Sequence, residues 1–394
     1  MSKFNLRALL LLGLTLAAGY GLWQAYHSSG PIMSASISSN GTFAITAHKD
    51  QKLILWDLEG HRRKIISRNA NIYSAYFIKR QPIFLWQDLD NTVTAQSVNG
   101  EVKTAFELNK PTYGHLMTHD LSTYYYSGIG WGIFRRTEDG STETLKATDR
   151  RAFLGYHKLF NLSMDESEQW IVSAGSGEPK GFEPPYYRSL QEVLDQGADY
   201  QHLYSVALWN LETGQPTAKL DGNSSKTHAT ISPDGQWVIS ADENGIGSFW
   251  NTDQPETRHR LATYEGGIYL DDAPFEDGDP RKSDKSELID APAGLNNFTI
   301  TVAFIHNSEY YLRFGNNSHF TALFKTGSPW PVKYFDLGES PKLVTYGSQY
   351  DRNTAIATSP ESGTLVMGHQ STGGISVYQF DPEELTLERV WVVK

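Results

Sequence analysis

The stretch "ISSNGTFAITAHKDQKLILWDLEG", residues 37–60, decides the fold because it has the pattern of one small antiparallel sheet. A polar turn containing Asn40–Gly41 precedes the apolar run 43–47. A polar loop at 49–52 then leads into "LILWD", and a glycine turn follows. Such turn residues favour tight reversals between β-strands. The stretch therefore predicts three consecutive strands, and we expect further copies of this module along the chain.

The module recurs most clearly at residues 230–254 as "TISPDGQWVISADENGIGSFWNTDQ". A second copy is divided between 161–175 and 205–220, and weaker copies begin near residues 76, 116, 303 and 356. A repeat of about 40–50 residues is typical of propellers. The equivalent third-strand positions are Trp56, Gln96, Phe134, Trp209, Trp250, Phe324 and Tyr378. The chain thus contains seven modules.

A sheet of this size cannot bury both faces alone, but radial packing of copies around an axis buries them. We therefore predict an all-β fold: a seven-bladed β-propeller of four-stranded antiparallel blades over residues 31–394, preceded by one N-terminal hydrophobic helix. The last module has its own fourth strand, "LTLERVWVV" at 385–393. We expect this segment to complete blade seven, so that ring closure depends on packing between blades.

The repeats resemble those of the WD-repeat family. In blade one, Asp50 stands at the turn aspartate and Trp56–Asp57 at the name-giving pair. In blade five, Ser240, Asn244 and Trp250 stand at the family's Ser, Asp and Trp positions, and "GN" at 222–223 stands at its Gly-His. The structural repeat positions are Asp50, Trp56, Asp57, Trp209, Ser240 and Trp250.

Blades two, three, six and seven depart from the family pattern because they lack the tryptophan. The resemblance covers residues 32–392 and implies the fold. It says little about the function, because one fold hosts many functions. An eight-bladed quinoprotein-type propeller is the alternative, since "WNLETGQP" at 209–216 would suit its blades. The "SPDG" hairpin and "LWD" favour the WD type.

The N-terminus carries Lys3 and Arg7 before a nearly continuous apolar run at 8–23. Extended to Tyr26, the run has 19 residues, which is within the length of a membrane-spanning helix, with Trp23 and Tyr26 at the interface. We therefore interpret residues 1–30 as an uncleaved anchor in an inner or plasma membrane, with the propeller on the extracytoplasmic side. A signal peptide cleaved after Gly19 is the alternative and would give a secreted periplasmic protein.

Composition excludes several kinds of site. The net charge is −11 without a basic stripe, which argues against nucleic-acid binding. Cysteine is absent, so disulfides, thiolate metal sites and a cysteine nucleophile are excluded. His115 and His119 are four residues apart, but on a strand they would lie about 13 Å apart, too far to share a metal. We expect no catalytic residue, no metal and no cofactor.

Two insertions are the candidate functional segments. Residues 177–203 lie between the second and third strands of blade four, and residues 262–298 connect blade five to blade six. In a propeller these two kinds of connection leave from the same face. The second insertion holds nine acidic and three basic residues, a net charge of −6. The candidate binding residues are Phe182, Tyr186, Tyr187, Tyr269, Asp271, Asp272, Phe275, Asp277 and Asp279.

An aromatic surface with acidic neighbours suits a cationic peptide, a partner protein or a glycan. Acidic segments rich in proline and glycine are also typical of solvated connectors. We predict a non-catalytic, membrane-anchored protein-interaction scaffold of the cell envelope, with an unidentified protein partner. The alternative is a propeller hydrolase or lyase that acts on an extracytoplasmic sugar or peptide at the channel mouth, which would need convergent acid, base or metal groups.

Overall fold

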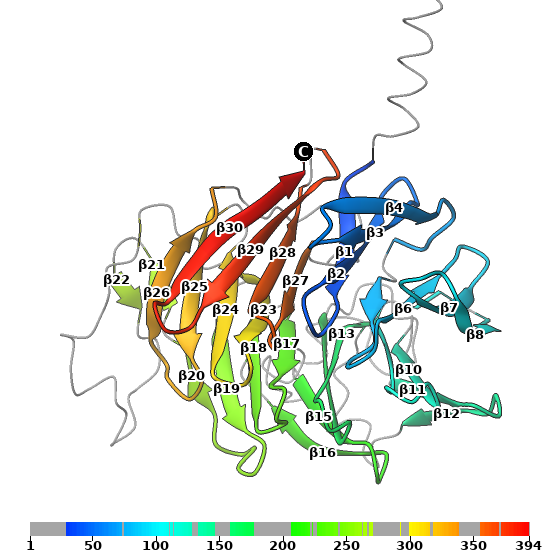
Figure 1. The fold of residues 1–394 in the computed structure, drawn as a ribbon. Coiled ribbons are helices and arrows are strands. Elements are labelled where there is room, and N and C mark those ends of the chain that lie inside the picture. Colours follow the sequence, from blue (N-terminus) through cyan, green and yellow to red (C-terminus); the bar gives the residue numbers. More distant parts are fainter. Residues whose placement is uncertain are drawn as a thin grey trace, which may run out of the picture.

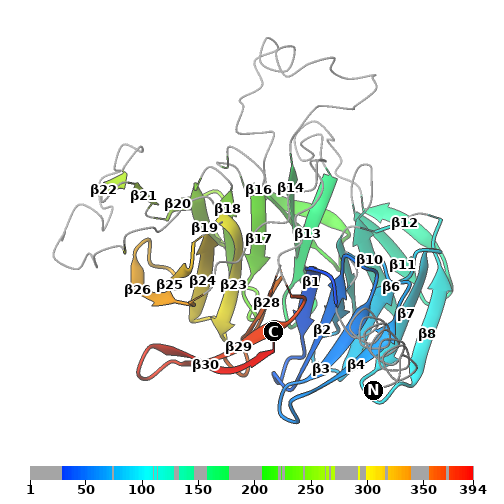
Figure 2. The ribbon, with the colours of Figure 1, turned by 90° about the horizontal axis from the view of Figure 1, so that it is seen from above.

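The computed structural model contains seven four-stranded antiparallel sheets arranged as the blades of a β-propeller (Figures 1 and 2). It describes residues 29–72, 75–109, 111–112, 114–127, 133–145, 158–176, 206–220, 223, 227–242, 245–261, 263–265, 268–270, 292, 299–315, 318–338, 355–369 and 372–393. Within these ranges there is no helix long and apolar enough to cross a membrane. The predicted N-terminal helix lies outside the described residues.

Each blade follows the chain from its innermost to its outermost strand. Blade one contains β1 (Ile32–Ile37), β2 (Phe43–His48), β3 (Leu53–Asp57) and β4 (Arg62–Ser67). Blade two contains β5 (Tyr76–Phe77), β6 (Ile83–Gln87), β7 (Thr92–Ser97) and β8 (Val102–Glu107). Blade three contains β9 (Gly114–Met117), β10 (Thr123–Ser127), β11 (Ile133–Thr137) and β12 (Thr142–Leu145). Blade four contains β13 (Lys158–Met164), β14 (Trp170–Ser176), β15 (Val206–Asn210) and β16 (Gln215–Leu220).

The remaining three blades have the same strand order. Blade five contains β17 (Thr227–Ile231), β18 (Trp237–Asp242), β19 (Gly247–Asn251) and β20 (His259–Arg260). Blade six contains β23 (Thr299–His306), β24 (Tyr310–Gly315), β25 (Phe320–Lys325) and β26 (Pro331–Asp336). Blade seven contains β27 (Ile356–Ser359), β28 (Thr364–Gly368), β29 (Ile375–Asp381) and β30 (Thr386–Val393). A separate hairpin of β21 (Thr263–Glu265) and β22 (Ile268–Leu270) follows blade five.

The hydrophobic core is divided into seven clusters, and each cluster lies between two neighbouring blades. Strand alternation explains this arrangement, because successive side chains point to opposite faces of a blade. In β19, for example, Trp250 packs toward blade four while Phe249 packs toward blade six. Every blade therefore depends on both neighbours to bury its apolar residues.

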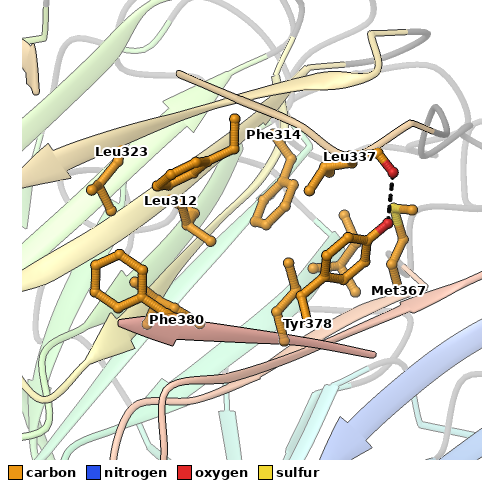
Figure 3. Packing of buried hydrophobic residues seen from close by; sticks show 11 residues of the cluster. Leu312, Phe314, Leu323, Leu337, Met367, Tyr378 and Phe380 are labelled. Atoms are coloured by element: carbon orange, nitrogen blue, oxygen red, sulfur yellow. Dashed lines mark hydrogen bonds between the residues drawn. The ribbon is translucent and has the colours of Figure 1, made fainter. Parts of the chain in front are cut away.

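The aromatic residue at the repeated third-strand position packs against the preceding blade. Trp56, Trp209 and Trp250 do so and are buried. In blade seven Tyr378 takes this position and packs against blade six (Figure 3). Its hydroxyl donates a hydrogen bond to the Leu337 carbonyl at 2.7 Å, which satisfies the polar end of the ring. Tyrosine can thus replace tryptophan where a carbonyl lies within reach.

The ring closes without strand exchange, as expected, because blade seven consists of β27 to β30 in chain order. Side chains of blades one and seven form one shared cluster. Within it, Trp391 of β30 contacts Trp56 edge-on at 6.4 Å between ring centroids and stacks on His61 at 4.8 Å. The turn of blade one also lies close to blade seven, since a Cβ at Gly41 would overlap Ser362 Oγ.

The outermost strands carry regular β-bulges. In five blades the fourth strand has one extra residue opposite the third strand: Ile66, Lys103, Thr217, Val332 and Val390. A bulge twists an edge strand and interrupts its hydrogen-bonding pattern, which disfavours pairing with another chain. Val390, the extra residue in blade seven, is 58% exposed.

The ring closure is testable through Trp391. Replacing it with alanine should lower the free energy of unfolding by about 2 kcal/mol or more, since the substitution removes a partly buried aromatic side chain from the closing interface. Val390→Ala is the matched control in the same strand and should change the stability by less than about 0.5 kcal/mol. Urea denaturation of both variants measures the difference. Equal stability of the two variants would contradict the role given to Trp391.

Candidate functional site

The predicted binding residues fall almost entirely outside the described residues. These are Phe182, Tyr186, Tyr187, Asp271, Asp272, Phe275, Asp277 and Asp279. Tyr269 lies in β22, and its backbone pairs with Tyr264 of β21. The predicted interaction surface therefore remains a prediction, and the described structure defines the scaffold from which it extends.

The strands flanking both insertions are described, and their ends define one face of the propeller. Residues 177–205 connect β14 to β15, and residues 261–298 connect β20 to β23. In an antiparallel blade, second strands end and third strands begin on the face where the next blade also begins. We call this the insertion face. The opposite face, which carries the turns between first and second strands, is called the turn face.

A buried arginine joins blades five and six close to the insertion face. Arg313 in β24 donates a hydrogen bond from Nη2 to the Gly245 carbonyl at 2.6 Å. Burial lowers the pKa of Arg313 to about 10, and the charge of Asp242 opposes this shift. Asp242 is itself buried and accepts from the Ile246 amide at 2.9 Å. These contacts stabilise the two blades between which the acidic insertion runs.

The structural repeat position Trp56 lies in a hydrogen-bonded chain within blade one. Its indole Nε1 donates to Thr46 Oγ1 at 2.8 Å, and Thr46 Oγ1 lies 2.8 Å from His48 Nε2. His48 Nδ1 lies 2.8 Å from the Gly30 carbonyl. Burial lowers the pKa of His48 to about 4, so the imidazole is neutral at pH 7. This chain ties β2, β3 and the entry to β1 together.

Four other repeat positions, Trp209, Ser240, Asp57 and Asp50, form side-chain hydrogen bonds or ion pairs within their own blades. Trp209 Nε1 donates to Ser173 Oγ at 2.9 Å, and Ser240 Oγ donates to Asn223 Oδ1 at 3.1 Å. Asn223 thus provides the acceptor at the position where the family's histidine stands. Asp57 forms an ion pair with Arg62 at 2.7 Å, and Asp50 forms one with Lys52 at 2.7 Å.

The turn face carries a ring of hydrogen bonds that joins all seven blades. Each bond links the turn of one blade to the turn of the next. The donor and acceptor pairs are Arg80 N to Ser39 Oγ (2.9 Å), Gln81 Nε2 to His119 O (3.3 Å), His119 N to Glu168 Oε1 (2.6 Å), Glu166 N to Pro233 O (2.9 Å), Asp234 N to Ser308 Oγ (3.0 Å), Asn307 N to Pro360 O (2.8 Å), and Ser359 Oγ to Ser39 O.

Two basic side chains of blade two reach past blade three to blade four. Lys79 Nζ donates to the Met164 carbonyl, and Arg80 Nη2 lies 3.4 Å from Glu166 Oε2. Lys79 lines a pocket of about 190 Å³ at the turn-face end of the central channel. Burial lowers the pKa of Lys79 to about 8, although the charges of Glu166, Asp165 and Glu168 raise it in part. The sequence analysis missed this pocket.

The sequence did not mark Lys79 as a pocket residue. It lies in the turn of a weak repeat copy, and basic residues are common in exposed turns. Only ring closure brings it beside Met164 and the innermost strands of distant blades. Among the residues that the structure describes, no group of three histidine, aspartate or glutamate side chains is arranged to hold a metal ion.

The lowered pKa of Lys79 gives a test of its burial. The folded chain releases this proton near pH 8, whereas an unfolded chain retains it to about pH 10.4. Because the unfolded state binds more protons in this window, the free energy of unfolding should rise as the pH increases from 8 to 10. Lys79→Met should remove this contribution to the rise.

Urea denaturation at several pH values measures the effect of Lys79. Lys325→Met is the control, because Lys325 is an exposed lysine on the same face, 3.6 Å from Glu309. Its pH dependence should match that of the unsubstituted chain. If Lys79→Met also matched the unsubstituted chain, Lys79 would not be buried as described.

Comparisons with known proteins agree with this architecture. The family model "WD domain, G-beta repeat" (WD40) matches residues 24–57 and 214–251, which end at the third strands of blades one and five. The β-propeller domain of Cps50 (Swd1) from Myceliophteria thermophila is similar in structure, with a TM-score of 0.59 at 13% identity. The superposition covers 90% of this chain and 98% of that one. No curated protein sequence matches the chain.

The matched segments are the two copies in which the sequence pattern is clearest, and the structural likeness extends over nearly the whole chain. At 13% identity the likeness concerns the fold alone. The chain contains WD40 repeats in a seven-bladed β-propeller.

Proposed function

We propose that the chain is a non-catalytic scaffold that binds a protein partner through the two insertions on its insertion face. WD40 propellers commonly act as platforms for protein complexes, and loops carried by a rigid scaffold are usual binding elements. The observation that supports this proposal most directly is the difference in length among equivalent connections. Residues 49–52 and 88–91 join second to third strands in blades one and two, whereas residues 177–205 do so in blade four.

The described scaffold is suited to presenting such loops. Blades four, five and six, from which the insertions extend, are packed through two continuous apolar clusters and joined by the Arg313 contact to Gly245. Paired strands border each insertion: β14 pairs with β15 as far as Ser173↔Ala207, β19 pairs with β20 as far as Ser248↔Arg260, and β23 pairs with β24 from Thr299↔Gly315. Changes within the insertions should therefore leave the blades intact. The acidic character of residues 262–298 favours a partner with a basic surface.

The proposal includes a location. Residues 8–26 act as a membrane anchor, and the propeller lies on the extracytoplasmic side of an inner or plasma membrane. The apolar run and its basic flank at Lys3 and Arg7 support this orientation. Since β1 begins on the insertion face, an anchor directly before it would start on the same side as the strand ends that border both insertions. A partner would then bind close to the membrane surface.

Deletion of the acidic insertion tests the scaffold function. A chain lacking residues 266–294 should lose a protein that cross-links to the full chain in membranes, because its main binding surface is gone. Mass spectrometry of the cross-linked product identifies the partner. A chain of unchanged length, with the insertion's acidic residues replaced by Asn and Gln, separates the effect of charge from that of length.

Both altered chains should keep the melting temperature of the full chain. The proposed function would be wrong if the same partner cross-linked equally to the full chain, the shortened chain and a chain lacking residues 180–200.

Alkaline carbonate extraction tests the anchor. The full chain should stay in the membrane pellet, whereas a chain lacking residues 8–26 should be released or fail to be exported. A mature N-terminus starting at residue 20, determined by sequencing the purified protein, would instead support cleavage after Gly19 and a secreted protein.

A further inference from the structure

The outermost strand of blade one is a basic surface on an acidic chain. Residues 60–87 hold six lysine or arginine residues and no aspartate or glutamate, although the whole chain has a net charge of −11. Four of the six lie on or directly after β4, at the edge of the blade (Figure 1). They are Arg62, Arg63, Lys64 and Arg68, and all four are exposed. We call these side chains the basic rim, which is an exception to the chain's general lack of a basic stripe.

Acidic neighbours offset only part of the charge of the basic rim. Arg62 forms its ion pair with Asp57, and the carboxylate of Asp50 pairs with Lys52 of the same blade. Over residues 29–72, six basic residues stand against three acidic ones, which leaves a net charge of +3. The neighbouring blades two and seven have net charges of −1 over residues 75–109 and −4 over residues 355–393. The positive surface is therefore confined to blade one.

The turn face has the opposite charge. Its connections, which join first to second and third to fourth strands, hold sixteen acidic and three basic residues, a net charge of −13. Every blade contributes at least one of these acidic residues. An anionic surface would repel the turn face and attract the basic rim, so the charge distribution favours one orientation of the propeller beside such a surface.

The described chain begins on the same blade as the basic rim. The Lys49 amide donates a hydrogen bond to the Pro31 carbonyl at 2.8 Å, which fixes the start of β1 at the insertion-face end of blade one. Fourth strands run from the turn face to the insertion face, so β4 also ends there, next to Arg68. Residues 1–28, which include the proposed anchor, therefore lead into the blade and the face on which Arg68 lies.

Two exposed apolar side chains of blade two flank the basic rim. Leu89 is 48% exposed, and its amide donates to the carbonyl of Asn69, the residue after Arg68, at 3.1 Å. Val102 is 55% exposed and lies two residues after Gly100, where a Cβ would be 3.9 Å from Lys64 Nζ. Basic side chains beside apolar ones suit a bilayer surface, because the former contact phosphate groups and the latter enter the headgroup boundary.

We propose that the basic rim of blade one binds the anionic phospholipid headgroups of the membrane that holds the N-terminal anchor. This inference rests on the proposed location and adds an orientation to it: blade one contacts the bilayer, and the turn face points away. Each basic side chain close to an anionic bilayer strengthens binding about fivefold. Four such side chains are sufficient here, because the anchor holds the basic rim at a high effective concentration near the lipid.

The lack of cysteine in the chain allows one reporter to be placed at a chosen position of the full chain. Asn69→Cys, exposed next to Arg68, carries an environment-sensitive fluorophore. Gln254→Cys, exposed on the turn face of blade five, is the control position. The labelled chains are reconstituted into vesicles of phosphatidylcholine or of an equimolar mixture with phosphatidylglycerol, and both kinds contain a lipid with a nitroxide on its headgroup.

Nitroxide quenching reports the contact between the label and the headgroups. Quenching at Asn69→Cys should be about threefold stronger or more in the vesicles with phosphatidylglycerol, because only these carry a negative surface charge. The label at Gln254→Cys should be unquenched in both kinds of vesicle. Equal quenching at Asn69→Cys in the two kinds of vesicle, or stronger quenching at Gln254→Cys, would overturn the inference.

A matched pair of variants assigns the contact to the basic rim. Lys64→Glu and Lys325→Glu both replace an exposed lysine with glutamate, the first in β4 and the second in β25 of blade six. Lys64→Glu should lower the quenching at Asn69→Cys to the level seen with phosphatidylcholine alone, since it removes one positive charge and adds a negative one. Lys325→Glu should leave the quenching unchanged. An equal effect of the two variants would show that net charge alone matters and that the basic rim is not the contact.

Carbonate extraction of the same vesicles separates this inference from the proposed location. If the chain stays in the pellet but the quenching does not depend on phosphatidylglycerol, the lipid contact of the basic rim is wrong and the anchor stands. If the chain is released from both kinds of vesicle although the quenching depended on phosphatidylglycerol, the anchor is wrong and the lipid contact stands.

Discussion

The interaction on which the structure depends is the burial of two apolar faces of every blade against its neighbours. Each of the seven core clusters lies between adjacent blades. A single blade has no core of its own, so the sheets are stable only as a closed ring. This packing matters most where the first and last blades meet. All other neighbouring blades are also joined by the chain, whereas blades one and seven are joined neither by a direct connection nor by an exchanged strand. There Trp391 packs on Trp56 and His61 to complete the seventh interface.

Polar contacts follow from the same closure. The turns between first and second strands converge on the turn face, and their amides, carbonyls and hydroxyls bond from blade to blade around the whole ring. The inner strands are linked similarly, since Ser36 Oγ accepts from the Phe77 amide at 2.8 Å and Asn161 Oδ1 accepts from the Ala229 amide at 3.0 Å. These bonds satisfy backbone groups that would otherwise face the channel. The backbone amides of Phe77 and Arg80, on either side of Lys79, take part in these bonds.

The two faces consequently differ in character. On the turn face the connections are short and their polar groups are committed to the ring, which leaves a small recessed pocket as the available site. On the insertion face two connections are far longer than their equivalents in other blades. The fold permits long connections on one face because its blades are held together by the cores between them and not by their loops.

The sequence by itself determined the number of blades, the strand order and the position of the packing aromatics. Each of these depends on short-range patterns: turn residues, β-rich runs and the recurrence of Trp56, Trp209 and Trp250 at equivalent positions. Closure by β30 was also predictable, because a fourth strand followed the last repeat. The bulges in the outer strands were not predictable from the sequence. The pairing register of the third and fourth strands depends on the twist that a blade adopts between its neighbours.

Only the tertiary structure decided which residues meet at the turn-face end of the channel. Tyr76, Lys79 and Glu166 belong to two weak or divided repeat copies, and their spacing in the chain carries no sign of proximity. They come together because ring closure places the innermost strands of all blades around one axis. Local sequence patterns encode how a blade forms, whereas a site shared by six blades exists only once all of them have packed.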